Sequence, residues 1–438
     1  MNLFWKYLFG KITSTDKLEK AEAELINNFE RYSEIEKSLE LVEYNKLFHE
    51  VKSSTFVDNK KILQNRKYKD TEEYRNSSKF RKLDNSKNIK TYYSVLSSLE
   101  LEQYLKFKSG PDYEDLGRKK KVKASEKLQE LKKFQRSKAY KTYSRFHESY
   151  ILKEYEELKI LVSEEKFNEN NKFWENPKRW ETTPEYSKEQ RYYELAKNHD
   201  IIFYNKQNPS RFEPLKAKIE TLNEPFDWNT LDKSRWSFGF CYKSSKLIKC
   251  HSFANEKQAN NNGQNVTVDD GILKITTEHE KIKAAAWHPI KGFIEKEFEY
   301  SSDIVQSSSN FRQKNGIFSA KLKCTGKIHH AFWLGTENKL PHINIFHFNG
   351  KRIRVGNVNK NVVDGISIRG INPAKYHIYS LKWTDNELIW SINDFEVYRT
   401  TSNIPKEAMY LAFNSFITEK QIGDTGVLEI DWVKVYKY

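Results

Sequence analysis

The sequence predicts α + β structure in separate domains: an all-α helical repeat or bundle at residues 1–215 and an all-β jelly-roll sandwich at residues 220–438. Two observations predict this division. In the first half glycine is scarce, Lys, Glu and Leu are abundant, and apolar residues such as Leu39 and Val42 recur at three- and four-residue steps. From about residue 223, Gly, Asn and Thr become more frequent and apolar residues alternate with period two.

The helical half contains an internal repeat, because SLELVEY (38–44) is echoed by SLELEQY (98–104). A looser form, Ser with Tyr six positions later and an apolar or small residue after three more, recurs at Ser86/Tyr92/Val95, Ser137/Tyr143/Phe146, Ser149/Tyr155/Leu158 and Ser187/Tyr193/Ala196. Each Ser at a helix N-cap would accept a hydrogen bond from a first-turn amide. Helices this short are unstable alone, so we expect an irregular array that serves as a scaffold or interaction surface.

In the second half, four runs with period two are separated by Gly, Asn and Asp turns. They are Gly271–Thr277, Gly316–Lys323, Leu388–Ile392 and Val427–Tyr436. Consecutive antiparallel strands of this kind predict a sandwich or jelly roll.

Seven segments of this half occur in an order that is informative when they are taken together. They are FDWNTLDKSRW (226–236), DGILKIT (270–276), NGIFSAKLK (315–323), AFWLG (331–335), HIYSLKW (377–383), IWSIND (389–394) and IDWVKVY (430–436). Their order resembles glycoside hydrolase family 16, the laminarinase-like β-glucanases with a concanavalin A-like jelly roll. The resemblance implies this fold and a sugar-binding cleft.

The family carries its chemistry on a Glu-x-Asp-x-x-Glu strand, where a bulge points all three acids into the cleft. Retaining hydrolysis needs two carboxyl groups about 5–5.5 Å apart. The matching strand reads LPHINIFHF (340–348), so the resemblance implies that His342, Asn344 and His347 replace the nucleophile, the tuning acid and the acid/base. We therefore predict a degenerate hydrolase that is not an enzyme.

A cleft without these acids can still hold a glycan. The residues that we expect on its concave side are Trp333, Trp287, Asn310, Arg312, Asn344, His342, His347 and Phe348. For Trp333 a place in the core is the alternative, and Trp383, Trp390 and Trp432 are expected in the core. Imidazoles at two of the acid positions would make affinity sensitive to pH near their ordinary pKa of about 6.5.

Two metal sites come into question. His329, His330, His342 and His347 lie within nineteen residues of one another, but loose histidine clusters seldom converge as zinc requires. The resemblance also implies a structural calcium ion held partly by Asp431. No other cofactor is expected.

Composition limits the partners and the compartment. The 75 basic and 60 acidic residues give a net charge of +15, but they are interleaved, which favours a solvated surface over nucleic-acid binding. The three cysteines, Cys241, Cys250 and Cys324, predict no disulfide framework. The N-terminal apolar stretch is interrupted by Lys6, making it a poor signal peptide and too short to span a bilayer. We expect a soluble protein made in the cytoplasm, with no membrane partner.

These features favour a non-catalytic carbohydrate-binding or structural protein. Residues 1–215 would attach to other proteins of an assembly, and a phage virion with its tail or head fibres fits a sugar-type domain that lacks a secretion signal. Assembly as a homo-oligomer is compatible with this setting. The alternatives are an active endo-β-glucanase with relocated acids, for which Glu337 and Asp364 are the nearest candidates, and a structural scaffold without a sugar ligand.

Overall fold

The computed structural model describes residues 1–244, 246–338, 340–359 and 362–438. It confirms a helical first half and a second half built mainly of β-sheets. The chain forms two compact units: Ser33–Lys206, called the arm below, and Met1–Tyr32 with Gln207–Tyr438, called the sandwich unit. The compact units divide at residues 32/33 and 206/207, so the first 32 residues group with the β-sheets, whereas the sequence predicts one boundary between residues 215 and 220.

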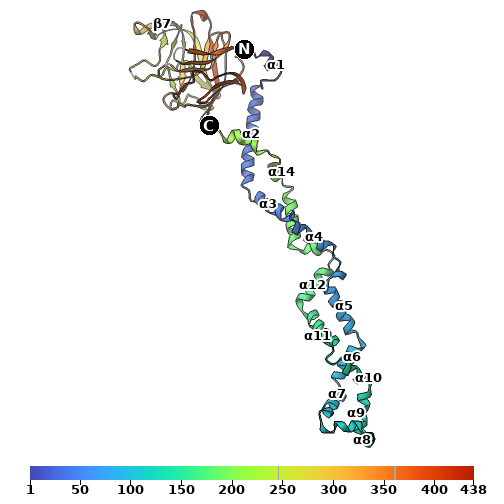
Figure 1. Cartoon of the computed structure of the whole chain (residues 1–438). Helices are drawn as coiled ribbons and strands as arrows, with labels where there is room; N and C mark the ends of the chain where they lie inside the picture. The colour runs from blue at the N-terminus through green and yellow to red at the C-terminus, as the bar shows by residue number, and fades with distance from the viewer. Residues whose placement is uncertain (245, 339, 360–361) are drawn as a thin grey trace. The chain divides into compact units, whose positions relative to one another are not determined.

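Short helices make up the arm, which begins within α2 (Thr15–Glu36). The others are α3 (Leu39–Val51), α4 (Ser54–Asn65), η1 (Tyr68–Asp70), α5 (Glu72–Asp84), α6 (Lys87–Leu96), α7 (Leu99–Lys108), η2 (Pro111–Gly117), α8 (Lys119–Ala124), α9 (Glu126–Arg136), α10 (Lys138–Phe146), α11 (Tyr150–Ser163), α12 (Glu165–Glu175), η3 (Arg179–Thr182), α13 (Pro184–Leu195) and α14 (His199–Lys206). They form a hairpin in which α3 packs on α13, α5 on α11, α6 on α10 and α7 on α9. Figure 1 shows the outgoing helices in blue beside the returning ones in green.

Side-chain caps begin many of these helices, as the repeat predicts. Hydrogen bonds of 3.0–3.3 Å run from the amide three residues on to the hydroxyls of Ser38, Ser98, Ser137 and Ser149. Ser86 precedes α6 without such a bond. The prediction for Ser187 is wrong, because it lies inside α13, whose cap is Thr183. Proline at the first position of α13 sets the helix start there.

Stacked aromatic rings join the two sides of the arm. Ring centroids lie 5.2–5.8 Å apart in the pairs Tyr44–Tyr192, Phe80–Tyr155 and Tyr92–Tyr143. The repeat correctly picks out Tyr92, Tyr143 and Tyr155 as buried, but in α13 it selects the exposed Tyr193 instead of Tyr192. The hairpin thus stabilises its short helices pair by pair.

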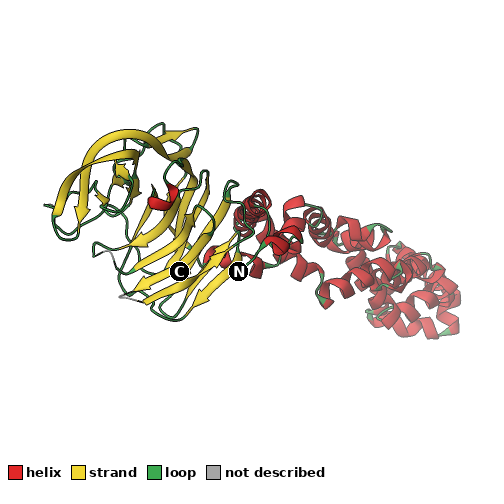
Figure 2. Ribbon diagram, turned by 90° about the horizontal axis from the view of Figure 1, so that it is seen from above, coloured by secondary structure: helices red, strands yellow, loops and turns green. Residues whose placement is uncertain are grey.

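The sandwich unit contains eighteen strands in the described residues. Strands are drawn in yellow in Figure 2. They are β1 (Ile219–Glu224), β2 (Ser237–Phe238), β3 (Ser252–Phe253), β4 (Gln258–Asn260), β5 (Val266–Asp269), β6 (Ile272–His288), β7 (Gly292–Ser302), β8 (Ile304–Gln306), β9 (Gly316–Cys324), β10 (His329–Gly335), β11 (His342–Asn349), β12 (Ile353–Asn359), β13 (Val362–Ile368), β14 (His377–Trp383), β15 (Leu388–Ile392), β16 (Phe395–Thr400), β17 (Tyr410–Phe416) and β18 (Gly426–Lys437). One sheet runs β16-β15-β14-β9-β18-β6-β7-β4, with β1, β3 and β5 paired alongside. The other runs β13-β12-β11-β10-β17-β8-β2.

The two sheets enclose one core to which both contribute. Fully buried aromatic residues of this core are Phe318, Trp383 and Trp390 from the first sheet and Phe332, Phe346 and Phe413 from the second. Trp383 and Trp390 are therefore core residues, as predicted. Trp432 instead lies half-buried under α2, where its indole N–H donates to Glu19 Oε1 at 2.9 Å.

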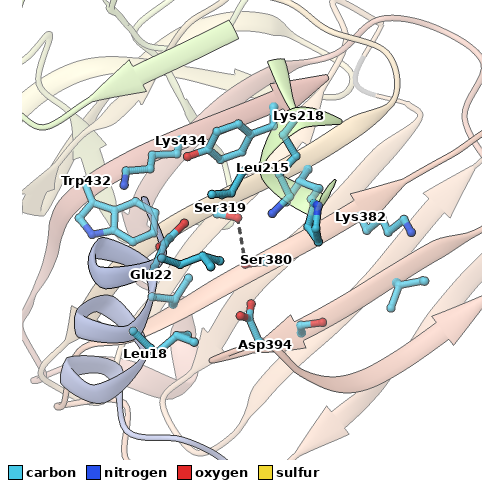
Figure 3. A pocket seen from close by; sticks show the side chains of 18 residues that line it. Leu18, Glu22, Leu215, Lys218, Ser319, Ser380, Lys382, Asp394, Trp432 and Lys434 are labelled. Atoms are coloured by element: carbon cyan, nitrogen blue, oxygen red, sulfur yellow. Dashed lines mark hydrogen bonds between the residues drawn. The ribbon is translucent and has the colours of Figure 1, made fainter. Parts of the chain in front are cut away.

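Residues 1–32 belong to this unit through contacts that the sequence pattern does not reveal. Leu3, just before α1 (Phe4–Leu8), is fully buried in the core, and its N–H donates to the carbonyl of Arg369 at 2.8 Å. Farther along, α2 lies over the first sheet, where Glu19 pairs with Lys321 at 2.9 Å. A hollow of about 440 Å³ remains between them, above the hydrogen-bonded hydroxyls of Ser319 and Ser380 (Figure 3).

Candidate functional site

The second sheet has a face turned away from the core, and strand alternation decides which side chains reach it. On β10, Phe332 is fully buried in the core, whereas its neighbours Ala331 and Trp333 lie on the other side. Strand β17 pairs with β10 and adds Tyr410 and Asn414 there. These residues form part of the lining of one cavity.

A β-bulge on β11 brings the three predicted positions to this same face. The pairing of β11 with β12 shifts between Asn344 and His347. Two consecutive residues, Ile345 and Phe346, are buried as a result. His342, Asn344 and His347 therefore line the cavity together, in the arrangement that the bulged motif predicts.

The cavity has a volume of about 380 Å³, within the usual range for small-ligand sites. Strands β10, β11 and β17 contribute to its lining. The loop before β3 contributes Phe240 and Tyr242, and β3 itself contributes Phe253. Aromatic and uncharged polar side chains thus form most of its surface.

Trp333 lies on β10, which is between β11 and β17 in the sheet. Its ring stacks on the imidazole of His342, with centroids 4.8 Å apart and planes at 28°. Its indole N–H donates to Asn414 Oδ1 at 3.0 Å. His342 Nε2 lies 3.0 Å from Asn344 Oδ1, and because an amide oxygen only accepts, the imidazole donates in this contact.

A second pair of side chains links His347 to His329, with 2.9 Å between Nε2 of the first and Nδ1 of the second. Burial and the charge of Arg354 lower the pKa of His329 to about 4. Burial and the neighbouring histidines lower the pKa of His347 to about 3, and burial also lowers the pKa of His342. All three rings are therefore neutral at pH 7. For His342 and His347, the two positions concerned, the lowered pKa moves any sensitivity to pH from the expected 6.5 to more acidic values.

One carboxyl group of the cavity, that of Glu256, is not among the residues predicted from the sequence. Glu256 lies in the turn between β3 and β4 and lines the cavity. Its Oε2 accepts a hydrogen bond from the N–H of Phe253 at 2.8 Å. Burial raises the pKa of Glu256 to about 7, against the opposite effect of this bond, the Gln258 side chain and Lys296. None of the seven segments includes this residue, so only tertiary packing reveals it.

Arg312 lies beside the cavity. Its Nη2 atom is 3.5 Å from the sulfur of Cys241, and its guanidinium lies 5.8 Å from the ring centroid of Tyr410. Both of these neighbours line the cavity. An ion pair of 2.5 Å with Glu337 holds the guanidinium in place.

Three other predicted ligand residues lie outside the cavity lining. Phe348 is only 7% exposed and faces the core, because the bulge assigns it to the buried side of β11. Asn310 lines a separate hollow with Arg235. Trp287 is on β6 and packs edge-to-face on Phe293, with ring centroids 5.0 Å apart.

The two acids considered as relocated catalysts are engaged elsewhere. Glu337 is paired with Arg312. Asp364 accepts hydrogen bonds from the hydroxyls of Tyr398 and Thr400, the latter at 2.6 Å, and does not line the cavity.

The residues at the two predicted metal sites do not fit a metal ion. Lys321 Nζ lies 2.9 Å from the Asp431 carboxylate, so a cation already neutralises this group. His330 turns into the protein interior, where it contacts Ser415 Oγ at 2.8 Å and the Thr325 carbonyl at 2.9 Å. Among the described residues, no three or more His, Cys, Asp or Glu side chains come together as a metal site.

Helices in the described ranges lack the combination of length and apolar character that a membrane span requires.

Comparisons with known proteins concern the β half. The family model described as Glycosyl hydrolases family 16 matches residues 253–434. The endo-1,3-1,4-beta-glycanase ExsH of Rhizobium meliloti (strain 1021) is 23% identical over 188 residues, which are 39% of this chain and 39% of that protein. The alignment thus spans well under half of that relative's length.

Two examples of similar solved structures each cover half of this chain. The catalytic domain of an endo-1,3-beta-glucanase (laminarinase) from Thermotoga petrophila RKU-1 has 17% identity and a TM-score of 0.41, covering 50% of this chain and 98% of that one. The endo-beta-1,3-glucanase from Pyrococcus furiosus has 16% identity and a TM-score of 0.41, covering 50% and 94%. The family match establishes that residues 253–434 carry a glycosyl hydrolases family 16 domain.

Proposed function

We propose that the family 16 domain of this chain binds carbohydrate in the cavity beside Trp333 and does not hydrolyse it. The observation that carries the proposal is the identity of the three residues on the bulged strand. His342, Asn344 and His347 share the cavity face, where the resemblance implies three acids. Two neutral imidazoles and an amide cannot supply the pair of carboxyl groups that glycoside hydrolysis uses.

The same side chains suit the holding of a sugar. Trp333 offers apolar ring surface, and indole and imidazole N–H groups with amide oxygens offer donors and acceptors for hydroxyl groups. The low pKa values of His329 and His347 keep these groups uncharged at neutral pH. A cavity of this composition favours an uncharged, hydroxyl-rich ligand.

Binding is tested on a glycan array and by titration calorimetry with the glycan that responds. Trp333→Ala is expected to weaken binding at least about tenfold, because it removes the indole ring that lines the cavity beside His342, while the fold persists. Trp287→Ala is the matched control, since this tryptophan lies outside the cavity lining, and should leave affinity unchanged. Equal losses in both variants contradict the assigned site, and an array without hits favours the structural scaffold.

The absence of hydrolysis is tested with laminarin and mixed-linkage glucan. The protein is expected to release no reducing sugar, and measurable turnover would refute the proposal. The triple change His342→Glu, Asn344→Asp and His347→Glu restores the acids on an unchanged strand. It should produce detectable hydrolysis if these positions have simply lost their acids.

A second candidate, hydrolysis with a relocated acid, is favoured by one observation. Glu256 lines the cavity, and its pKa is raised to about 7, as suits a general acid near neutral pH. Among the described residues that line this cavity it is the single carboxylic acid, so a second carboxyl group is missing. Turnover that is lost in Glu256→Gln would establish this candidate.

The setting that we propose is an assembly to which the helical half attaches the chain, with a virion appendage as the specific case. Its support is the hairpin arm, which offers a long helical surface, and the sugar-type domain of the other unit. Co-purification of the protein with virus particles, and its copy number there, tests the setting. Absence from purified particles would remove it.

A further inference from the structure

Positive charge is concentrated where the hairpin of the arm turns. From Arg118 to Arg145, a stretch of 28 residues, twelve side chains are basic and two are acidic. The rest of Ser33–Lys206 contains 26 basic and 28 acidic residues. The arm owes its net positive charge to this stretch, which we call the basic tip.

The basic tip spans α8, α9 and α10 at the turn of the hairpin (Figure 1). Helices α9 and α10 contribute to a small apolar cluster there. Leu131 is buried there with Tyr104 and Leu116, so the apolar side chains point inward and the cations outward. Helix α8 contributes no buried residue and has no side-chain cap. Lys119 and Lys123 are four positions apart on it, where like charges destabilise a helix. The run of lysines in α8 is therefore not explained by a contribution to the stability of the arm.

Acidic neighbours neutralise little of this charge. Asp115 contacts Arg118 at 3.1 Å and Lys121 at 2.7 Å, and Glu114 contacts Arg118 at 3.7 Å. Nine further cations of the tip are exposed, and the described residues offer none of them a carboxylate within 4.0 Å; Lys120 and Lys141 are examples. Closely spaced cations of this kind raise the local potential and attract a polyanion.

We propose that the basic tip binds an anionic polysaccharide that carries carboxylate or sulfate groups along its chain. Nine of the twelve cations are lysines, which act as hydrated point charges and not as bidentate clamps for phosphate. Between Lys106 and Ser149, all of which the structure describes, no large apolar side chain is exposed. The tip therefore offers nothing to enter a bilayer or to stack on nucleic-acid bases.

The choice of a polysaccharide among polyanions rests on the proposed function, because a family 16 domain on the same chain makes glycan the expected ligand class. A polymer that presents an acidic group every few ångströms can meet several lysines at once. Each contact releases a counterion, so the interaction must weaken steeply with salt.

The test measures binding of the full chain to dextran sulfate, with uncharged dextran of equal length as the control polymer. Changing Lys119, Lys120, Lys121 and Lys123 to Gln should weaken binding roughly tenfold or more at low salt. Helix content should stay the same, because α8 buries no side chain. The matched control changes four exposed lysines elsewhere on the arm, Lys61, Lys69, Lys82 and Lys87, and should cost less than about twofold.

Salt and competing ligands decide the remaining outcomes. Between about 50 and 200 mM salt the affinity of the unchanged protein should fall by roughly tenfold or more, and that of the tip variant less. Equal losses in the two lysine variants would overturn the proposal. Tighter binding to duplex DNA or to phosphatidylserine vesicles would overturn the assignment to a polysaccharide.

Failure of this proposal can be told apart from failure of the proposed function. Trp333→Ala changes the cavity and leaves the tip intact, so binding to dextran sulfate should be unchanged. Loss of binding to dextran sulfate in this variant would indicate that the polymer binds in the cavity, and would overturn the proposal for the basic tip. If the protein binds dextran sulfate but no uncharged glycan, the result would refute the function proposed for the cavity and support the proposal for the basic tip.

Discussion

The arm and the sandwich unit bury their aromatic side chains in different ways. In the arm a ring such as Tyr92 stacks on Tyr143 of the facing helix, and helices pack mainly on the helix opposite them in the hairpin. In the sandwich unit, Phe332 stacks on Phe413, with centroids 4.6 Å apart, inside a core that both sheets share. Loss of a buried ring in the arm should therefore destabilise only the helices around it, whereas loss of a buried ring in the sandwich unit should destabilise both sheets.

The largest expected effect comes from Phe332→Ala. It should lower the free energy of unfolding of the sandwich unit by about 4 kcal/mol, because it leaves a cavity in a closely packed core. Tyr143→Ala is the counterpart in the arm. Hydrogen exchange should then show lost protection across both sheets in the first variant and only around α6 and α10 in the second. If both variants lose protection only near the substituted residue, the two units do not differ in this way.

Acid should destabilise the sandwich unit through His330. Burial, the main cause, lowers its folded-state pKa to about 4, so between pH 6.5 and 4 the unfolded chain takes up the proton first. The contribution of the neutral ring to the free energy of unfolding is complete above pH 6.5. About 3 kcal/mol of it is lost as the pH falls toward 4. Urea unfolding across this range measures the slope. His330→Gln should reduce this slope by the share that His330 contributes, and an unchanged slope would contradict the assignment.

Glu256 should act in the opposite direction. Its pKa is raised to about 7, so ionisation of the buried carboxyl lowers stability as the pH rises from about 4.5 to 7. At pH 8, Glu256→Gln should therefore be more stable than the unchanged protein by about 2 kcal/mol, with allowance for partial exposure. The difference should vanish near pH 4.5. Thermal unfolding at both pH values measures it, and a constant difference would argue against titration of this group.

The smallest effect concerns the helix caps of the arm. Ser98→Ala removes the hydroxyl that accepts a hydrogen bond from Leu101 N–H at 3.3 Å and should cost about 1 kcal/mol. Ser86→Ala is the matched control, because Ser86 occupies the same position without such a bond. Its cost should be close to zero. Equal costs would mean that the repeat stabilises the arm by another route.

Local patterns were sufficient for much of the candidate site. Alternation along β10 and β11, with one bulge, places Trp333, His342, Asn344 and His347 on one face, and these are neighbours within short strands. Phe348 was expected in the cleft, but its side chain lies in the core. The bulge buries both Ile345 and Phe346, which reverses the alternation for the residues that follow. Glu256 escaped notice because it reaches the cavity from a turn between other strands, and no periodicity marks a turn residue as part of a distant site.

The sequence by itself determined the class of each half, the serine caps of most repeats and the chemical character of the bulged strand, because all of these depend on residues close together in the chain. Tertiary structure alone decided how the helices pair across the arm, why residues 1–32 belong with the sheets, and which way the ionisable groups shift. These depend on burial and on contacts between residues hundreds of positions apart, such as Leu3 with Arg369.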